Sequence, residues 1–229
     1  MIKIDLQFFG GRGSSSSSGG GGGGATFSTG QNNGKQNKQG LAGQTYFEDG
    51  NKVSVDGTLN FWEGKSKDLK HEELLMIGED GFAVAYFKGG STSVGFSIPD
   101  GVDPSTIVLT HNHPYGTKAT GDRTIGGSFS NADLKNHISG GFKETRATSV
   151  EGTYSFKAAK GVKQDSQGFL NALNKRQSEC GAKADATYKA GKAKGSTKSY
   201  IDTYLETCHD WYSTNCKKYG YEYSFTPNS

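Results

Sequence analysis

The chain has 229 residues, which is room for one domain of ordinary size, and 35 of these residues are glycine. Only 32% of the residues are hydrophobic, and no stretch approaches the roughly 20 apolar residues of a membrane span, so we expect no membrane partner. The formal net charge of +3 is too small to indicate nucleic-acid binding by itself.

The first 44 residues differ in composition from the rest of the chain. Residues 1–9 alternate apolar and polar side chains, a pattern typical of a short strand or a docking peptide, and they are too short and interrupted for a signal sequence. Residues 10–44 are rich in glycine and serine, whose contacts cannot offset the backbone entropy lost on ordering. We therefore expect a short apolar N-terminal segment on a disordered linker, in a cytoplasmic protein.

From residue 45 the composition becomes that of a folded domain. β-Branched and alternating apolar residues predict strands, and turn residues separate them. The expected strands cover residues 74–77, 82–87, 92–98, 106–110, 144–150 and 153–158, and a helix begins at Ser130. We assign residues 45–160 to one core domain.

Residues 161–229 are expected to form a helical, basic region that ends in a short strand. Apolar residues at helical spacing predict a helix after Asp165, broken near residues 191–195, and a second helix that stops near Gly220. An alternating segment from Tyr221 to Phe225 follows. The order of the predicted strands and helices along the chain indicates an α/β fold in which helices flank a mixed sheet.

Charge and cysteine content add two expectations for this region. The segment from Lys157 to Lys198 contains ten lysine or arginine residues and three acidic ones. These basic residues could bind a phosphate backbone or an acidic partner protein, or they could form a solvated helix surface. Cys180, Cys208 and Cys216 form no CxxC pair, so we expect reduced, partly buried thiols and neither a thiolate zinc site nor a disulfide framework.

The segment Thr110-His111-Asn112-His113-Pro114 ends the predicted central strand. Two histidines at positions i and i+2 of an extended backbone lie on the same side, so His111 and His113 can converge on one metal ion. Pro114 then stops the strand and leaves both imidazoles at the edge of the sheet. Asp133, in the first turn of the next helix, can supply a third ligand. Three such ligands leave a fourth tetrahedral position for water, as in catalytic zinc sites.

Two neighbouring side chains have an alternative interpretation. Ser130 and Asp133 have the spacing of a helix N-cap and its acidic N3 residue, and we expect this cap to fix the turn from which Asp133 reaches the metal. His137 follows Asp133 by one helical turn and could face the same site, but an exposed position on the helix is the expectation.

These residues resemble the motif of the JAMM (MPN+) zinc metallopeptidases and of the RadC-like proteins, in which an upstream glutamate precedes His-x-His-Pro and Ser-x-x-Asp. The resemblance covers roughly residues 69–156 and implies a JAMM-like, cytidine-deaminase-like α-β-α fold. It implies that His111, His113 and Asp133 bind Zn²⁺. It further implies that Ser130 stabilises the oxyanion and that a glutamate accepts a proton from the zinc-bound water, which attacks an amide bond of a protein or peptide substrate.

The resemblance does not decide which glutamate is the base, and it does not assign a role to the loop after Pro114. Glu72 and Glu73 both precede a strand, and alternation lets only one of them face the metal, with the spacing to the following turn favouring Glu72. Residues 115–129 make a connection roughly twice as long as the family's usual one. This insert is a lid over the substrate site or a plain loop, and in neither case should it break metal binding.

A second resemblance concerns the opening of the chain, residues 1–13, which looks like the start of many tailed-phage structural and head-associated proteins. Short runs near Glu144, Gly152 and Tyr219 also look like phage or prophage relatives of the JAMM family. This resemblance implies a phage or prophage protein whose N-terminal arm contacts capsid or portal proteins and associates it with the virion.

Three functions are therefore considered. The first is a zinc-dependent peptidase or isopeptidase with Glu72 as its base. The second is a non-catalytic, head-associated phage protein that retains the fold and a structural zinc ion. The third is an HNH-type nuclease, because the segment from His111 to Pro114 superficially resembles its ββα-metal motif and the basic helix suits DNA, although no acid directly precedes His111.

Overall fold

The computed structural model describes residues 3–7, 54–91, 93–114, 116–117, 123–124 and 127–228. The linker predicted for residues 10–44 and much of the 115–129 insert lie outside these residues. Within the described part of the chain, no helix has both the length and the apolar character that crossing a bilayer requires.

A six-stranded mixed sheet forms the centre of the fold, in the spatial order β10-β9-β8-β5-β2-β3. Its strands are β2 (Glu73–Ile77), β3 (Ala83–Lys88), β5 (Val108–Asn112), β8 (Glu144–Thr148), β9 (Gly152–Ala158) and β10 (Tyr221–Pro227). Neighbouring strands are antiparallel except β5 and β8, which are parallel. A parallel pair needs a crossover connection, and α2 (Asn131–Gly140) lies within it.

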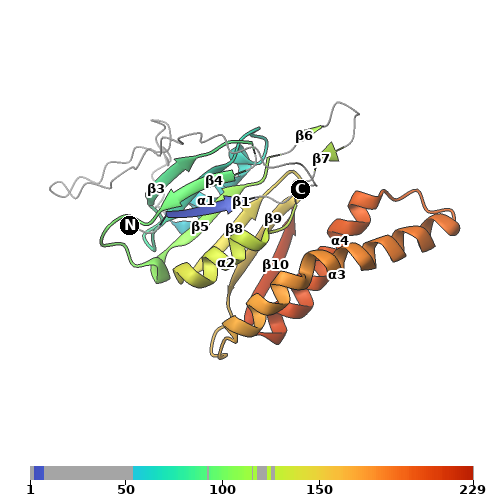
Figure 1. Ribbon diagram of the computed structural model, residues 1–229. Coiled ribbons are helices and arrows are strands. Elements are labelled where there is room, and N and C mark those ends of the chain that lie inside the picture. The colour runs from blue at the N-terminus through green and yellow to red at the C-terminus, as the bar shows by residue number, and fades with distance from the viewer. Residues whose placement is uncertain are drawn as a thin grey trace.

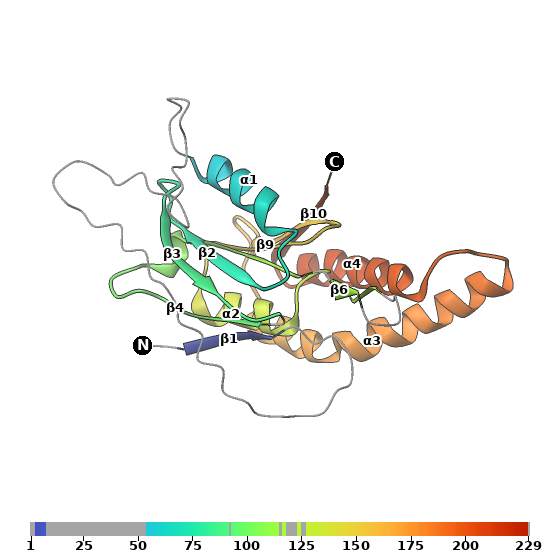
Figure 2. The ribbon, with the colours of Figure 1, turned by 90° about the horizontal axis from the view of Figure 1, so that it is seen from above.

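Helices cover both faces of this sheet. α1 (Val55–Ser66) lies on one face, and α2, α3 (Ser166–Ala193) and α4 (Tyr200–Lys218) lie on the other, as Figure 2 shows. α3 and α4 run side by side as a hairpin that extends past the sheet (Figure 1). The expectation of an α/β fold with helices flanking a mixed sheet is confirmed.

Three smaller elements complete the fold. β1 (Lys3–Gln7) pairs antiparallel with β4 (Ser93–Ser97) in a separate two-stranded sheet beside α2, so the described part of the N-terminal segment is a strand. β6 (Gly116–Thr117) and β7 (Arg123–Thr124) pair within the insert. A 3₁₀ turn at Pro104–Thr106 precedes β5.

The two faces of the central strands pack against different cores. Because side chains alternate along a strand, Leu74 and Met76 of β2 join one buried cluster and Leu75 and Ile77 join the cluster under α1. All four side chains are fully buried, and each such burial contributes roughly 1.5–3 kcal/mol. This double burial explains why the segment is apolar at every position, and it fixes the register of β2 against β5.

The predicted elements largely match the observed ones, with three differences. α1 was not predicted. β5 begins at Val108, later than expected, because residues 104–106 form the 3₁₀ turn capped by Asp103. β10 pairs with β9, so residues 161–229 share the sheet of the core. As predicted, α4 stops before Gly220, whose φ of 83° reverses the chain into β10.

Candidate metal centre

The two histidines of the motif lie at the carboxyl end of β5. His111 is a residue of the strand and pairs with Ala147 of β8, and the backbone N–H of His113 donates to the carbonyl of Thr148 at 2.8 Å. The extended backbone therefore continues to His113, and both imidazoles lie on the face of the sheet that α2 covers. Both side chains are buried, His111 completely.

The donor atoms of three residues converge on one point. The Nε2 atoms of His111 and His113 lie 2.9 Å apart, and the Oδ2 atom of Asp133 lies 3.5 Å from each of them. These three residues form the one group of potential metal ligands found within the described residues. Neighbouring ligand atoms of a tetrahedral zinc ion lie about 3.3 Å apart, because zinc–nitrogen bonds measure about 2.0–2.1 Å. The cluster can thus hold a metal ion after movements of a few tenths of an ångström.

A capping box positions Asp133 at the start of α2. The Ser130 hydroxyl accepts a hydrogen bond from the Asp133 backbone N–H at 3.2 Å, and the Asp133 carboxylate accepts one from the Ser130 backbone N–H at 2.6 Å. The box satisfies two N–H groups that a helix leaves unpaired at its beginning. The predicted cap is confirmed, and it fixes the carboxylate that faces the histidines.

The hydrogen bonds of His113 favour the form that can bind a metal. Its Nδ1 atom lies 2.7 Å from the carbonyl oxygen of Gly127, which can only accept, so Nδ1 carries the hydrogen. In the neutral ring, Nε2 then presents a lone pair to the centre. A second partner of this kind commonly orients a metal-binding histidine.

Charge in the centre favours a bound cation. Burial alone would raise the pKa of Asp133, but His111 and His113 outweigh burial and lower that pKa, so the carboxylate is ionised. Burial would lower the pKa of His113, but hydrogen bonding and attraction from Asp133, together with attraction from Glu72, raise it. The centre therefore attracts positive charge, which a proton or a metal ion can supply.

Of the two candidate glutamates, Glu72 is the one next to the cluster. Its side chain is buried, and its charge interacts with His113 and Asp133. Burial, the largest influence, raises the pKa of Glu72 to about 8 against the opposing effect of His113 and a hydrogen bond from the backbone of Val94. Glu73 instead pairs with His71 at 2.7 Å.

Asn112 holds these two glutamates in place, and the sequence alone did not single it out. Its side chain points away from the histidines that flank it, accepts from the Glu73 backbone N–H at 2.6 Å and donates to the His71 carbonyl at 2.9 Å. It therefore ties the end of β5 to the segment that carries Glu72. The available signal in the sequence was an amide side chain between two histidines at the end of a predicted central strand.

No protein-family model, curated protein or solved structure matches the chain. The case for the centre therefore rests on its own geometry. A buried group of His111, His113 and Asp133 can bind a metal ion.

The expectation that His137 is an exposed residue of α2 was wrong. Its side chain is only 3% exposed, its Nδ1 atom lies 2.9 Å from the hydroxyl of Thr145, and its ring packs edge-on against Phe156. Residue 137 is on the buried face of a helix that packs on the sheet, a tertiary contact that local sequence does not reveal. It is not part of the group of three ligands.

We expect His137 to make the fold sensitive to acid. Burial lowers its pKa to about 4, below the unfolded value of about 6.5, so the unfolded chain binds more protons between these pH values. The contribution of His137 to the free energy of unfolding is fully present above the unfolded pKa. It is lost as the pH falls toward 4, and the loss is about 3 kcal/mol at most. Urea denaturation of metal-free protein between neutral pH and about pH 4.5 should show a shallower pH dependence for His137→Gln. Equal slopes would contradict this assignment.

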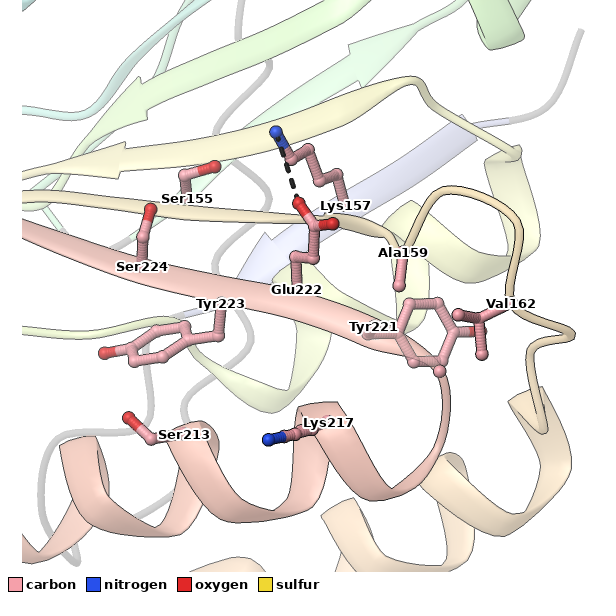
Figure 3. A pocket seen from close by; sticks show the side chains of 11 residues that line it. Ser155, Lys157, Ala159, Val162, Ser213, Lys217, Tyr221, Glu222, Tyr223 and Ser224 are labelled. Atoms are coloured by element: carbon pink, nitrogen blue, oxygen red, sulfur yellow. Dashed lines mark ion pairs between the residues drawn. The ribbon is translucent and has the colours of Figure 1, made fainter.

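A separate cavity of about 730 Å³ lies between β10 and the end of α4, as Figure 3 shows. Tyr221, Tyr223 and Lys217 contribute to its walls, and the ion pair between Lys157 and Glu222 lies on its strand side. None of its lining residues belongs to the metal-ligand group. The cavity therefore does not serve the candidate centre.

Proposed function

We propose that the chain is a zinc-dependent peptidase or isopeptidase of the JAMM type, from a phage or prophage. The observation that carries the proposal is the convergence of His111, His113 and Asp133, with the carboxyl group of Glu72 beside them. Two imidazoles and one carboxylate are a ligand set of catalytic zinc sites and leave a position for a reactant. The JAMM-type fold, the phage origin and contacts with capsid or portal proteins are parts of the proposal that rest on sequence resemblance.

The residues around the cluster have the chemistry for amide hydrolysis. A zinc ion held by His111, His113 and Asp133 would supply Lewis acidity, which would make water reactive at neutral pH and would polarise an amide carbonyl. The carboxylate of Glu72, which lies beside the three ligands, could take a proton from the attacking water and return it to the leaving amine. Ser130 Oγ accepts from the backbone of Asp133 and can still donate its hydrogen to the oxyanion.

The extent of burial favours a second candidate, a metal site that only stabilises the fold. His111, His113, Asp133 and Glu72 are each at most 2% exposed. A reactant would have to reach a centre that the chain covers almost completely. In this candidate the protein is a non-catalytic, head-associated component, and the same three residues hold a structural ion.

Metal analysis tests the part that both candidates share. Purified protein is expected to contain about one zinc ion per chain, and His113→Ala is expected to contain almost none because two ligands hold zinc poorly. His209→Ala is the control, since His209 contacts Tyr223 and takes no part in the cluster. Equal metal content in wild type and His113→Ala would place any bound ion elsewhere and end the proposal.

A further inference from the structure

The α3–α4 hairpin brings two cysteines to facing positions. Tyr188 meets Tyr200, with ring centroids 5.6 Å apart, and the guanidinium group of Arg176 lies 5.2 Å from the ring centroid of Tyr212. These two contacts set the register of the antiparallel helices. Between them, Cys180 lies eight residues before Tyr188, and Cys208 lies eight residues after Tyr200. Both thiols belong to the buried cluster that α3 and α4 share with the sheet, so they lie on the inner faces of the hairpin.

The surroundings of the pair favour an ionised thiol. Both cysteines are 1% exposed and belong to one buried cluster of side chains. The hydrogen bond from Cys180 lowers the pKa of Cys208 to about 7, with Arg176 and the hydroxyl of Tyr204 adding to this effect against the opposing effect of burial. Thiolate is the reactive form of cysteine, so the pair is set up for chemistry at neutral pH.

The third cysteine provides a contrast within the same core. Cys216 is also 1% exposed, but burial raises its pKa to about 12. Arg176, which lowers the pKa of Cys208, is not among the influences on Cys216. All three thiols are equally buried, and Cys208 is the one of the three whose pKa is lowered, whereas the pKa values of Cys180 and Cys216 are raised.

A surface cavity gives small molecules a route to Cys180. It has a volume of about 520 Å³ and lies between α3 and α4, and Cys180, Thr207 and Trp211 are among its walls. The exposed ion pair of Lys183 and Asp210, 3.6 Å apart, also lines it. A hydroperoxide is small and polar enough to enter such a space.

We propose that Cys180 and Cys208 form a redox-active dithiol that hydrogen peroxide oxidises to a disulfide joining α3 to α4. A thiolate of the pair attacks one peroxide oxygen, the O–O bond breaks, and the leaving hydroxide takes up a proton to become water. The second sulfur then displaces the oxygen of the resulting sulfenic acid as water, and the S–S bond forms. Two thiols and one peroxide thus give one disulfide and two water molecules. This activity is independent of the proposed hydrolase.

Oxidation of the full-length protein tests the proposal. After treatment with hydrogen peroxide at neutral pH and removal of the excess, the denatured protein should show one titratable thiol in place of three, and its mass should fall by two hydrogen atoms. Peptide mapping without reductant should find Cys180 linked to Cys208, and dithiothreitol should restore all three thiols. Cys180→Ser and Cys208→Ser should lose the link, whereas Cys216→Ser should keep it.

Three results would overturn the proposal. The first is that all three thiols of the folded protein survive treatment. The second is added oxygen on single cysteines without a cross-link. The third is a link that includes Cys216. If a serine variant fails to fold, as judged by circular dichroism, the mass and peptide map of the wild type still decide the question.

Discussion

Replacing Glu72 with glutamine is expected to abolish amide hydrolysis while leaving the bound metal in place. Glu72 is adjacent to the three ligands but is not one of them, so metal content should stay at about one ion per chain. Glutamine has nearly the same shape but cannot accept the proton of the attacking water, and general-base catalysis contributes about 10²–10⁴-fold to rate. The measurement is the turnover of any quenched fluorescent peptide or isopeptide-linked substrate that the wild-type protein cleaves, beside metal analysis of both proteins.

Glu73→Gln is the matched control for this experiment. It changes the adjacent carboxylate in the same way, but Glu73 pairs with His71 and its side chain is directed away from the cluster. Its activity should stay within a few fold of the wild type. Turnover that survives in Glu72→Gln, or even in the doubly substituted protein, would remove the proposed mechanism. Metal binding without cleavage in the wild type would favour the structural candidate.

Replacing Arg146 with alanine is expected to lower the free energy of unfolding by about 3–5 kcal/mol. Arg146 of β8 forms two hydrogen bonds with the carboxylate of Glu63 of α1, at 2.7 and 2.9 Å, and a third with Glu144 at 2.9 Å. The Glu63 side chain is only 8% exposed and also accepts from the hydroxyl of Thr110. Without Arg146, the buried charge of Glu63 loses its main partner. The free-energy penalty of this uncompensated charge is larger than the net contribution of the intact pair to stability.

An exposed ion pair nearby is the control for this loss. Lys143 pairs with Glu79 at 2.9 Å, but both side chains are about half exposed or more, so Lys143→Ala should change stability by no more than about 1 kcal/mol. Urea denaturation of the two variants at neutral pH compares them directly. The double variant Glu63→Met/Arg146→Met should recover much of the loss, because it removes both buried charges. Similar losses in Arg146→Ala and Lys143→Ala would refute this account.

The predictable parts of the fold are those whose signals are local in the sequence. The strand at residues 74–77 follows from a continuous apolar run, the hairpin at residues 144–158 follows from alternation and turn residues, and two of the candidate metal ligands follow from a histidine pair at a strand end. The sequence did not predict α1, because this helix buries few apolar side chains and contains two glycines. Its buried apolar residues are Leu59 and Trp62.

The remaining features depend on contacts between distant segments. Glu63 and Arg146 are 83 residues apart, and no spacing rule joins them. The choice of Glu72 over Glu73 is decided by Asn112 and His71, which fix how the chain enters β2. The pairing of Cys180 with Cys208 depends on the register of two helices, which aromatic contacts along the hairpin determine.

The crossover from β5 to α2 has a consequence for the order of folding. His113 and Asp133 are separated by 20 positions of the chain, whereas Glu72 lies 41 positions before His113. Contacts of low sequence separation close short loops and tend to form early, because less chain entropy opposes them. The three potential metal ligands are thus the more local part of the centre, and Glu72 joins them only when β2 takes its place between β3 and β5. A nascent chain can thus bring together the three residues that could bind a metal ion before Glu72 lies beside them.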